Sequence, residues 1–237
     1  MLEFFKVYKK FAIFFLFLSA IILTLFYYAL KPVKRLPIWS PGKNVNLELV
    51  DSTVSHIKKL HYIADFSLTN QNGETITQDN YKDKIYVADF FFTTCKSICP
   101  VMTSNMKRIQ QATLLDNDIM LLSHTEMPEI DTVAQLKRYA LEKGVLSDKW
   151  NLVTGSKKEL YNLARKSYLV AKYDPSKEDG YGFIHTENFV LVDKKKRIRG
   201  LYDGTNEEEI DRLLEDIQIL KEERKPRFSI GKLFFAD

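Results

Sequence analysis

The sequence predicts an α/β protein, a sheet with helices on both faces, behind a single N-terminal transmembrane helix. An unbroken apolar run at residues 11–30 indicates the transmembrane helix. Farther along the chain, short apolar segments that suit buried strands alternate with segments of helical periodicity. This alternation is typical of a sheet that helices cover on both sides. We therefore expect one anchor followed by one folded domain at residues 62–220.

The apolar run, FAIFFLFLSAIILTLFYYAL, contains no charged residue and has about the length that crosses a hydrocarbon core of roughly 30 Å. It is too long for the apolar region of a signal peptide, and no small-residue cleavage site follows it, so we expect an uncleaved anchor. Basic residues flank the run on both sides, and the positive-inside rule does not decide its orientation. They are Lys6, Lys9 and Lys10 before the run, and Lys31, Lys34 and Arg35 after it.

Composition divides the rest of the chain. Residues 31–61 contain Pro, Ser and Asn without sustained helical periodicity and are predicted to be a tether, while residues 221–237 form a basic C-terminal tail. The formal net charge is only +4, and no basic stripe is interleaved with aromatic residues. These features exclude a nucleic-acid partner from the prediction.

The first half of the domain is predicted to contain a hairpin and two buried strands. Residues 62–69 and 74–77 flank an Asn-Gly turn, which favours a β-hairpin. Residues 84–92 and 118–124 are nearly all apolar, as strands buried on both faces are. Between these two strands, Met102, Met106 and Ile109 recur at helical spacing, and the helix should run from Pro100 to about Leu115.

The second half of the domain adds helices and a closing hairpin. An amphipathic helix at residues 131–144 should end at Gly144, and a second should start at the Ser156/Glu159 capping pattern. Residues 187–204 form the hairpin. The last helix is predicted to begin behind a Thr205/Glu208 capping pattern and to bury an apolar stripe. This stripe consists of Ile210, Leu213, Leu214, Ile217 and Leu220.

The chain has only two cysteines, within the segment FFFTTCKSICPVM. Cys95 ends the turn after a buried strand, and Cys99 lies in the first turn of the next helix, with Pro100 just inside it. The partial positive charge of a helix N-terminus favours thiolate over thiol. We therefore expect two anionic sulfurs to converge at an exposed edge. Such a pair can close reversibly into a disulfide or hold a soft metal such as Cu(I).

Two simpler interpretations of the cysteines are weaker. Free cysteines are often small buried hydrophobes, but this does not explain a C-x3-C pair at a strand exit and helix entry in a chain without other cysteines. A purely structural disulfide across so short a loop would remove little entropy from the unfolded chain.

The four histidines are the candidates for a third metal ligand. His56 and His61 lie in the tether or just before the first strand and are expected to be solvated. His124 ends the second buried strand, at the edge of the cysteines if the two strands are parallel. His185 lies in a glycine-containing loop before the closing hairpin. The pattern alone leaves His124 and His185 equally eligible.

Two segments resemble a known family, the Sco (SenC) copper chaperones of cytochrome c oxidase assembly. FFFTTCKSICPVM matches its strand, C-x3-C-P motif and helix, and FIHTENFVLVD matches its histidine before a strand that ends in Val-Asp. The resemblance covers residues 62–220, and the N-terminal anchor is also similar. It implies a thioredoxin-like fold, with one copper bound by Cys95, Cys99 and His185.

The chain departs from common members of that family at two places. It has Cys95-Lys96 where they have Cys-Pro, and Ser97-Ile98 where they carry an Asp. It also has Ser-His-Thr-Glu at residues 123–126, where members have Ser-x-Asp-Pro. Because His124 occupies this second place, we consider it a possible fourth group at the copper site or a hydrogen-bond partner of a ligand.

The resemblance also implies a place and a partner. The domain should lie outside the cytoplasm, on the outer face of a bacterial inner membrane or its equivalent, with residues 1–10 in the cytoplasm. A cysteine pair that cycles between copper and disulfide needs a compartment where reducing buffers do not keep thiols reduced. The acceptor would be the copper-binding subunit of cytochrome c oxidase, and a thiol-disulfide reductase is a possible second partner.

The alternative prediction is a membrane-anchored thiol-disulfide oxidoreductase of the thioredoxin type. Such proteins normally carry C-x2-C, with a Thr-Pro peptide before the strand that faces the cysteines. This chain has C-x3-C, and His185-Thr186 stands at the equivalent place without a proline. We therefore predict a metallochaperone rather than an enzyme, whose cysteines can also reduce the thiols of the acceptor.

Overall fold

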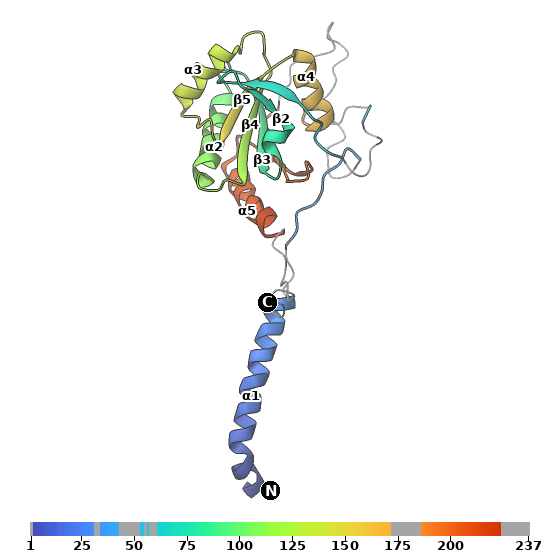
Figure 1. Cartoon of the computed structure of the whole chain (residues 1–237), viewed down its shortest axis with the longest axis vertical. Coiled ribbons are helices and arrows are strands. Elements are labelled where there is room, and N and C mark those ends of the chain that lie inside the picture. Colours follow the sequence, from blue (N-terminus) through green and yellow to red (C-terminus); the bar gives the residue numbers. More distant parts are fainter. Residues whose placement is uncertain are drawn as a thin grey trace, which may run out of the picture. The chain divides into compact units, whose positions relative to one another are not determined.

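The computed structural model describes residues 2–30, 34–42, 53–54, 56, 61–171 and 186–223 (Figure 1). Contacts between residues divide the chain into two units. The helix α1 (Leu2–Leu30) belongs to one of them, and the residues described between Leu36 and Leu220 belong to the other.

The helix α1 has the properties that the apolar run predicts. It is continuous, and the side chains of Phe11–Tyr28 are exposed along the whole segment. By length and composition it can cross a membrane, as can a signal sequence at this position.

The domain is built on a seven-stranded sheet of order β2-β1-β5-β4-β3-β6-β7 (Figure 1). Strands β3, β4 and β5 are parallel, and the other pairs are antiparallel. The strands are β1 (Ser67–Asn70), β2 (Thr75–Thr77), β3 (Ile85–Phe91), β4 (Ile119–Thr125), β5 (Trp150–Thr154), β6 (Asn188–Val192) and β7 (Ile198–Asp203).

Helices cover both faces of this sheet, as the alternating pattern predicts. One face packs against α2 (Cys99–Ala112), α3 (Val133–Lys143) and α5 (Glu207–Glu223). The other packs against α4 (Lys157–Asn162) and the π-helix that follows it, Leu163–Ser167. A short 3-10 helix, Gln78–Tyr81, connects β2 to β3. Each face therefore has its own apolar core.

The helix ends test the capping predictions. Ser156 accepts a hydrogen bond from the Glu159 backbone N–H, and Gly144 ends α3 in the left-handed region with φ 73°, so the predicted start of α4 and end of α3 are confirmed. The Glu159 side chain instead accepts from the N–H of Ser67. The prediction for Thr205 is wrong, because its hydroxyl and N–H donate to Asp203. Asn206 caps α5 instead, by accepting from the N–H of Glu208.

Part of the segment between α1 and the domain is docked onto the sheet. Arg199 of β7 donates from Nη2 to the carbonyl of Leu36 at 2.7 Å and from Nε to that of Pro37 at 3.0 Å. The Trp39 N–H donates to the carbonyl of Ile198 at 2.9 Å. Residues 36–40 therefore lie along the first residues of β7.

The parallel register lines up the starts of the central strands along one edge of the sheet and their ends along the opposite edge. Ile85 pairs with Ile119 where β3 and β4 begin, and Phe91 pairs with Thr125 where they end. We call the first the tether edge, because residues 36–40 dock there, and the second the cysteine edge, because Cys95 follows β3.

Candidate functional site

The two cysteines lie where the sequence places them. All seven residues of β3 are buried, and the chain then turns, with the Cys95 N–H donating to the carbonyl of Phe92 at 3.2 Å. Helix α2 begins at Cys99, with Pro100 in its first turn, where the missing N–H leaves no bond unmade. Cys95 is half-buried, whereas Cys99 is buried in the core beneath α2.

A buried carboxylate holds the loop that carries Cys95. Asp131 is fully buried and accepts hydrogen bonds from the N–H and the hydroxyl of Thr93 and from the hydroxyl of Thr125. The Gln135 side chain donates to the same Thr93 hydroxyl at 2.9 Å. Because Thr93 is two residues before Cys95, these bonds fix the approach of the chain to the first cysteine.

The two thiols differ in their ionisation. Burial would raise the pKa of Cys95, but hydrogen bonds from Ser97 and Cys99 outweigh it and lower this pKa to about 7. Burial, together with the hydrogen bond that the Cys99 thiol makes to Cys95, raises the pKa of Cys99 to about 12. Near neutral pH the site therefore holds one half-buried sulfur that is substantially thiolate and one buried thiol. The expectation of two anionic sulfurs is wrong for Cys99, because burial outweighs the helix N-terminus.

Two buried carboxyl groups lie toward the cysteine edge of the sheet. Burial, and then the negative charges of Cys95, Asp89 and Asp131, raise the pKa of Glu126 to about 9. Burial also raises the pKa of Asp89 to about 7, although Ser123 donates a hydrogen bond to it. One oxygen of each carboxyl group has no hydrogen-bond partner among the described residues. At pH 7 Glu126 is thus neutral, and it does not oppose the thiolate of Cys95.

His124 lies near the cysteine edge but on the other face of the sheet. Its ring stacks on Phe90 with centroids 4.7 Å apart, and it meets Phe66 and Tyr168 edge-on. Nδ1 lies 3.2 Å from the carbonyl of Asp89, and burial lowers the pKa of His124 to about 4. Phe90 belongs to the core of the α4 face, whereas Cys99 belongs to the core of the α2 face.

The other histidines have three different outcomes. His56 is exposed, as expected. The expectation that His61 is solvated is wrong, because His61 is buried and its Nε2 lies 2.7 Å from the carbonyl of Ser167 in the π-helix. His185 lies outside the described residues. Within the described ranges, no three His, Cys, Asp or Glu side chains form a metal-binding group.

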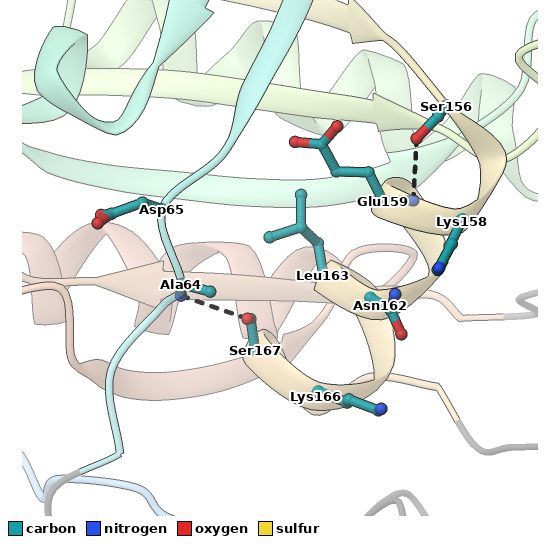
Figure 2. Close-up of a pocket in the computed structure, with 9 residues that line it drawn as sticks. All are labelled: Ala64, Asp65, Ser156, Lys158, Glu159, Asn162, Leu163, Lys166 and Ser167. Carbon is teal, nitrogen blue, oxygen red and sulfur yellow. Dashed lines mark hydrogen bonds between the residues drawn. The ribbon is translucent and has the colours of Figure 1, made fainter.

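A cavity of about 410 Å³ lies away from the cysteines (Figure 2). Ala64 and Asp65 line it on one side, and α4 and the π-helix line it on the other. Glu159, one of its lining residues, already accepts a hydrogen bond from the N–H of Ser67 at 3.0 Å. The cavity is separate from the site of the predicted chemistry.

Sequence reasoning missed the acidic residues around the cysteines. Asp89 interrupts an otherwise apolar strand, which is a visible signal of a buried polar group. Glu126 and Asp131 lie in a polar loop whose sequence gives no sign that they are buried. Only the parallel pairing of β3 and β4 brings that loop beside Cys95.

The sheet covered by helices on both faces, with two cysteines between a buried strand and the next helix, is the fold of a thioredoxin-like protein. The comparisons give the family. The model of the SCO1/SenC family matches residues 54–222. The chain belongs to the SCO1/SenC family.

Individual relatives agree with this assignment. The SCO1 protein homolog of Bacillus subtilis (strain 168) is 31% identical over 158 residues, which is 66% of this chain and 81% of that protein. BsSco, described as a Sco-family cytochrome c oxidase assembly protein with a disulfide switch, is 30% identical, with a TM-score of 0.57 over 67% of this chain and 92% of that one. ScoI of Bradyrhizobium japonicum, solved with copper bound, is 25% identical, with a TM-score of 0.52 over 65% of this chain and 98% of that one.

Proposed function

We propose that this protein is a membrane-anchored copper chaperone that binds copper through Cys95, Cys99 and His185. It delivers the copper to the copper-binding subunit of cytochrome c oxidase. The observation that carries the proposal is the cysteine pair itself, one half-buried sulfur with a pKa of about 7 hydrogen-bonded to a second sulfur at the helix entry. It is supported by membership in a family in which ScoI has been solved with copper bound.

The donor set suits copper as a cargo. Two thiolates and one imidazole are soft donors that Cu(I) prefers, and three ligands leave one side open for transfer. A closed four-ligand zinc site would not release its metal as readily. Cys95 is already substantially thiolate, the form that binds copper, at neutral pH, whereas Cys99 must lose its proton when copper binds. Copper uptake should therefore release protons.

The same cysteines can reduce a disulfide of the acceptor. The Cys95 thiolate attacks one sulfur of that disulfide, which breaks the acceptor S–S bond and forms a mixed disulfide. Cys99, after losing its proton to solvent, then attacks the sulfur of Cys95. The acceptor leaves as a dithiol, and Cys95 and Cys99 are left as an intramolecular disulfide. The disulfide switch described for BsSco supports this second activity.

The anchoring and the orientation are part of the proposal. Helix α1 holds the chain in the membrane, with the residues before it in the cytoplasm and the domain on the outer face. Protease added to spheroplasts should then remove the domain and leave the anchor. Complete protection of the domain, while a known outer-face protein is digested, would contradict this orientation.

Metal analysis with absorption spectra separates the chaperone from the oxidoreductase. The full chain, purified in detergent and loaded with copper, should hold about one copper per chain. The Cu(II) form should show thiolate-to-copper charge-transfer bands. Rapid disulfide exchange without stoichiometric copper would favour the oxidoreductase instead.

Alkylation tests the redox pair in the metal-free protein. The rate at Cys95 should rise with pH around a midpoint near 7, while Cys99 should stay unreactive until far higher pH. Mild oxidant should remove both free thiols without changing the monomer mass. Thiols that remain free after this treatment would contradict a reversible disulfide.

A further inference from the structure

Apolar side chains are exposed at the tether edge of the domain. Leu115, in the turn between α2 and β4, is 96% exposed, and its neighbour Leu114 is 48% exposed. Leu146, in the turn between α3 and β5, is 47% exposed. Single exposed leucines are ordinary, whereas apolar side chains that gather on one part of a surface suit a contact with an apolar partner.

Hydrogen bonds hold these two turns side by side. Lys149 donates from Nζ to the carbonyl of Asp116 at 2.5 Å, which links the turn before β5 to the turn before β4. Gln110, in the last turns of α2, donates to the carbonyl of Gly144 at 3.1 Å and accepts from the N–H of Leu146 at 2.9 Å. The two turns that carry the leucines are therefore held together. We call Leu114, Leu115 and Leu146 the leucine patch.

The segment that follows α1 docks at the same edge. Leu36 packs in the core cluster that contains Ile85 and Ile119, the first residues of β3 and β4. Arg199 holds Leu36 and Pro37 there. The six steps of the chain from the last residue of α1 to Leu36 can bridge at most about 22 Å when fully extended. If α1 spans a bilayer, so short a link keeps the tether edge near the lipid surface.

Charged residues around this edge are mixed. Lys84 donates to the carbonyl of Asn117, and Lys194 pairs with Asp118, so lysines and aspartates alternate in the turns beside the leucine patch. Lys34 and Arg35, before the docked segment, are exposed. Basic side chains at this level suit lipid headgroups. Because the aspartates offset part of the lysine charge, the contact should depend mainly on the leucines.

We propose that the leucine patch is a membrane-contact surface, which rests on the lipid bilayer that α1 spans. The leucines enter the boundary between headgroups and acyl chains, and the tether edge faces the lipid. This inference rests on the anchoring part of the proposed function and not on copper. Its consequence concerns the site: the seven residues of β3 separate the two edges by about 23 Å. An acceptor must therefore present its copper site or thiols well above the lipid surface.

Lipid-dependent quenching tests the contact in the full chain. Cys95→Ser and Cys99→Ser remove the native thiols, and Leu115→Cys then carries an environment-sensitive fluorophore. The labelled chain is placed at one copy per phosphatidylcholine nanodisc, with and without brominated acyl chains. Ile130→Cys is the matched control, because Ile130 is also an exposed apolar residue but lies at the cysteine edge. Quenching by brominated lipid should be several-fold stronger at position 115 than at position 130, and only the label at 115 should show a blue shift.

Other outcomes would overturn the proposal. Equal quenching at the two positions, or none at position 115, would mean that the patch does not meet lipid. A blue shift at position 115 that appears only with two copies per disc would make the patch an interface between copies of the chain. Quenching at position 115 that requires phosphatidylglycerol in the disc would mean that charge, rather than the leucines, brings this surface to the lipid. A chain that does not stay with the discs would instead refute the anchoring by α1, while copper binding by the wild-type chain remains a separate measurement.

Discussion

The two edges of the sheet differ in how their buried charged groups are compensated. At the tether edge, Arg199 is buried beside the carboxylate of Asp193 and donates to it at 3.0 Å while it holds the docked segment. At the cysteine edge, Glu126 and Asp89 are buried and form no ion pair with the residues that the structure describes, and burial raises the pKa of both. Arg199 thus compensates the charge of Asp193 at the tether edge, whereas at the cysteine edge burial keeps Glu126 neutral at pH 7.

This difference separates attachment from chemistry. A buried ion pair that is also hydrogen-bonded to the backbone gives a rigid connection, and losing either partner leaves a buried charge. Neutral carboxyl groups beside a thiol instead allow the site to change its charge when it gains copper or loses electrons. We therefore expect changes at the tether edge to affect stability, and changes at the cysteine edge to affect ionisation and metal binding.

The largest effect on stability should come from Arg199→Ala. Arg197 still pairs with Asp193 in this variant, so the loss comes mainly from the carbonyls of Leu36 and Pro37, which lose their charged donor. The free energy of unfolding should fall by about 3 to 5 kcal/mol. Arg197→Ala is the matched control, because Arg197 also binds Asp193 but is more exposed and does not hold the docked segment. It should lower the free energy by about 1 kcal/mol.

Urea unfolding of the full chain in detergent, followed by tryptophan fluorescence, measures both variants. Trp39 reports on the docked segment, and Trp150 reports on the core. Equal losses in Arg199→Ala and Arg197→Ala would show that docking adds nothing to the ion pair.

Asp131→Ala should have the next largest effect. It removes the acceptor of three donors, from Thr93 and Thr125, and should destabilise the domain by about 3 kcal/mol. Hydrogen exchange at the Thr93 and Cys95 amides should also become faster. Glu129→Ala, at an exposed position of the same loop, should change stability by no more than about 0.5 kcal/mol. Unchanged exchange at Cys95 would contradict the role of Asp131 in holding the cysteine loop.

Glu126→Gln should change how stability depends on pH. The pKa of Glu126 is raised to about 9 in the folded protein from 4.5, so its contribution to stability is complete below pH 4.5 and is lost as the pH rises through 9. One such group changes the free energy of unfolding by at most about 1.4 kcal/mol per pH unit. Asp89 acts in the same direction up to a pKa of about 7, while the lowered pKa of Cys95 acts in the opposite direction from about 7 upward.

The quantity to compare is therefore the difference in free energy of unfolding between wild type and Glu126→Gln at each pH. Urea unfolding at several pH values from 6 to 9 should show that the variant loses less stability on going from pH 6 to pH 9. Parallel profiles would mean that Glu126 ionises in the folded protein as it does in the unfolded chain.

Leu115→Ser should have the smallest effect on folding. Because the side chain is almost completely exposed, the free energy of unfolding in detergent should change by no more than about 0.5 kcal/mol. A larger loss would show that Leu115 packs within the domain, and the leucine patch would then be part of the fold rather than a contact surface.

Much of the fold could be predicted because its elements have local causes. The apolar β3, the helical spacing after Pro100, Gly144 at the end of α3 and Ser156 at the start of α4 each act over a few residues. The failures are non-local. His61 is buried by a partner 106 residues away, and Thr205 is bound to Asp203 rather than to its helix.

The candidate site could be predicted only in part for the same reason. The C-x3-C spacing locates the sulfurs but does not tell which one is buried, because Cys99 is covered by a core that forms only when α2 packs on the sheet. Likewise, nothing near Glu126 in the sequence indicates that Cys95 lies close enough to raise the pKa of its carboxyl group. Burial and pairing across the sheet decide both.

Copper affinity of the ligand variants tests the central claim most directly. The full chain in detergent competes for Cu(I) with a chromophoric chelator, and Cys95→Ala, Cys99→Ala and His185→Ala should each weaken binding by more than about 100-fold, the upper limit for loss of an outer hydrogen-bond partner. His56→Ala, at an exposed position, should bind as wild type does. Wild-type affinity in His185→Ala would contradict the assignment of His185 as a copper ligand.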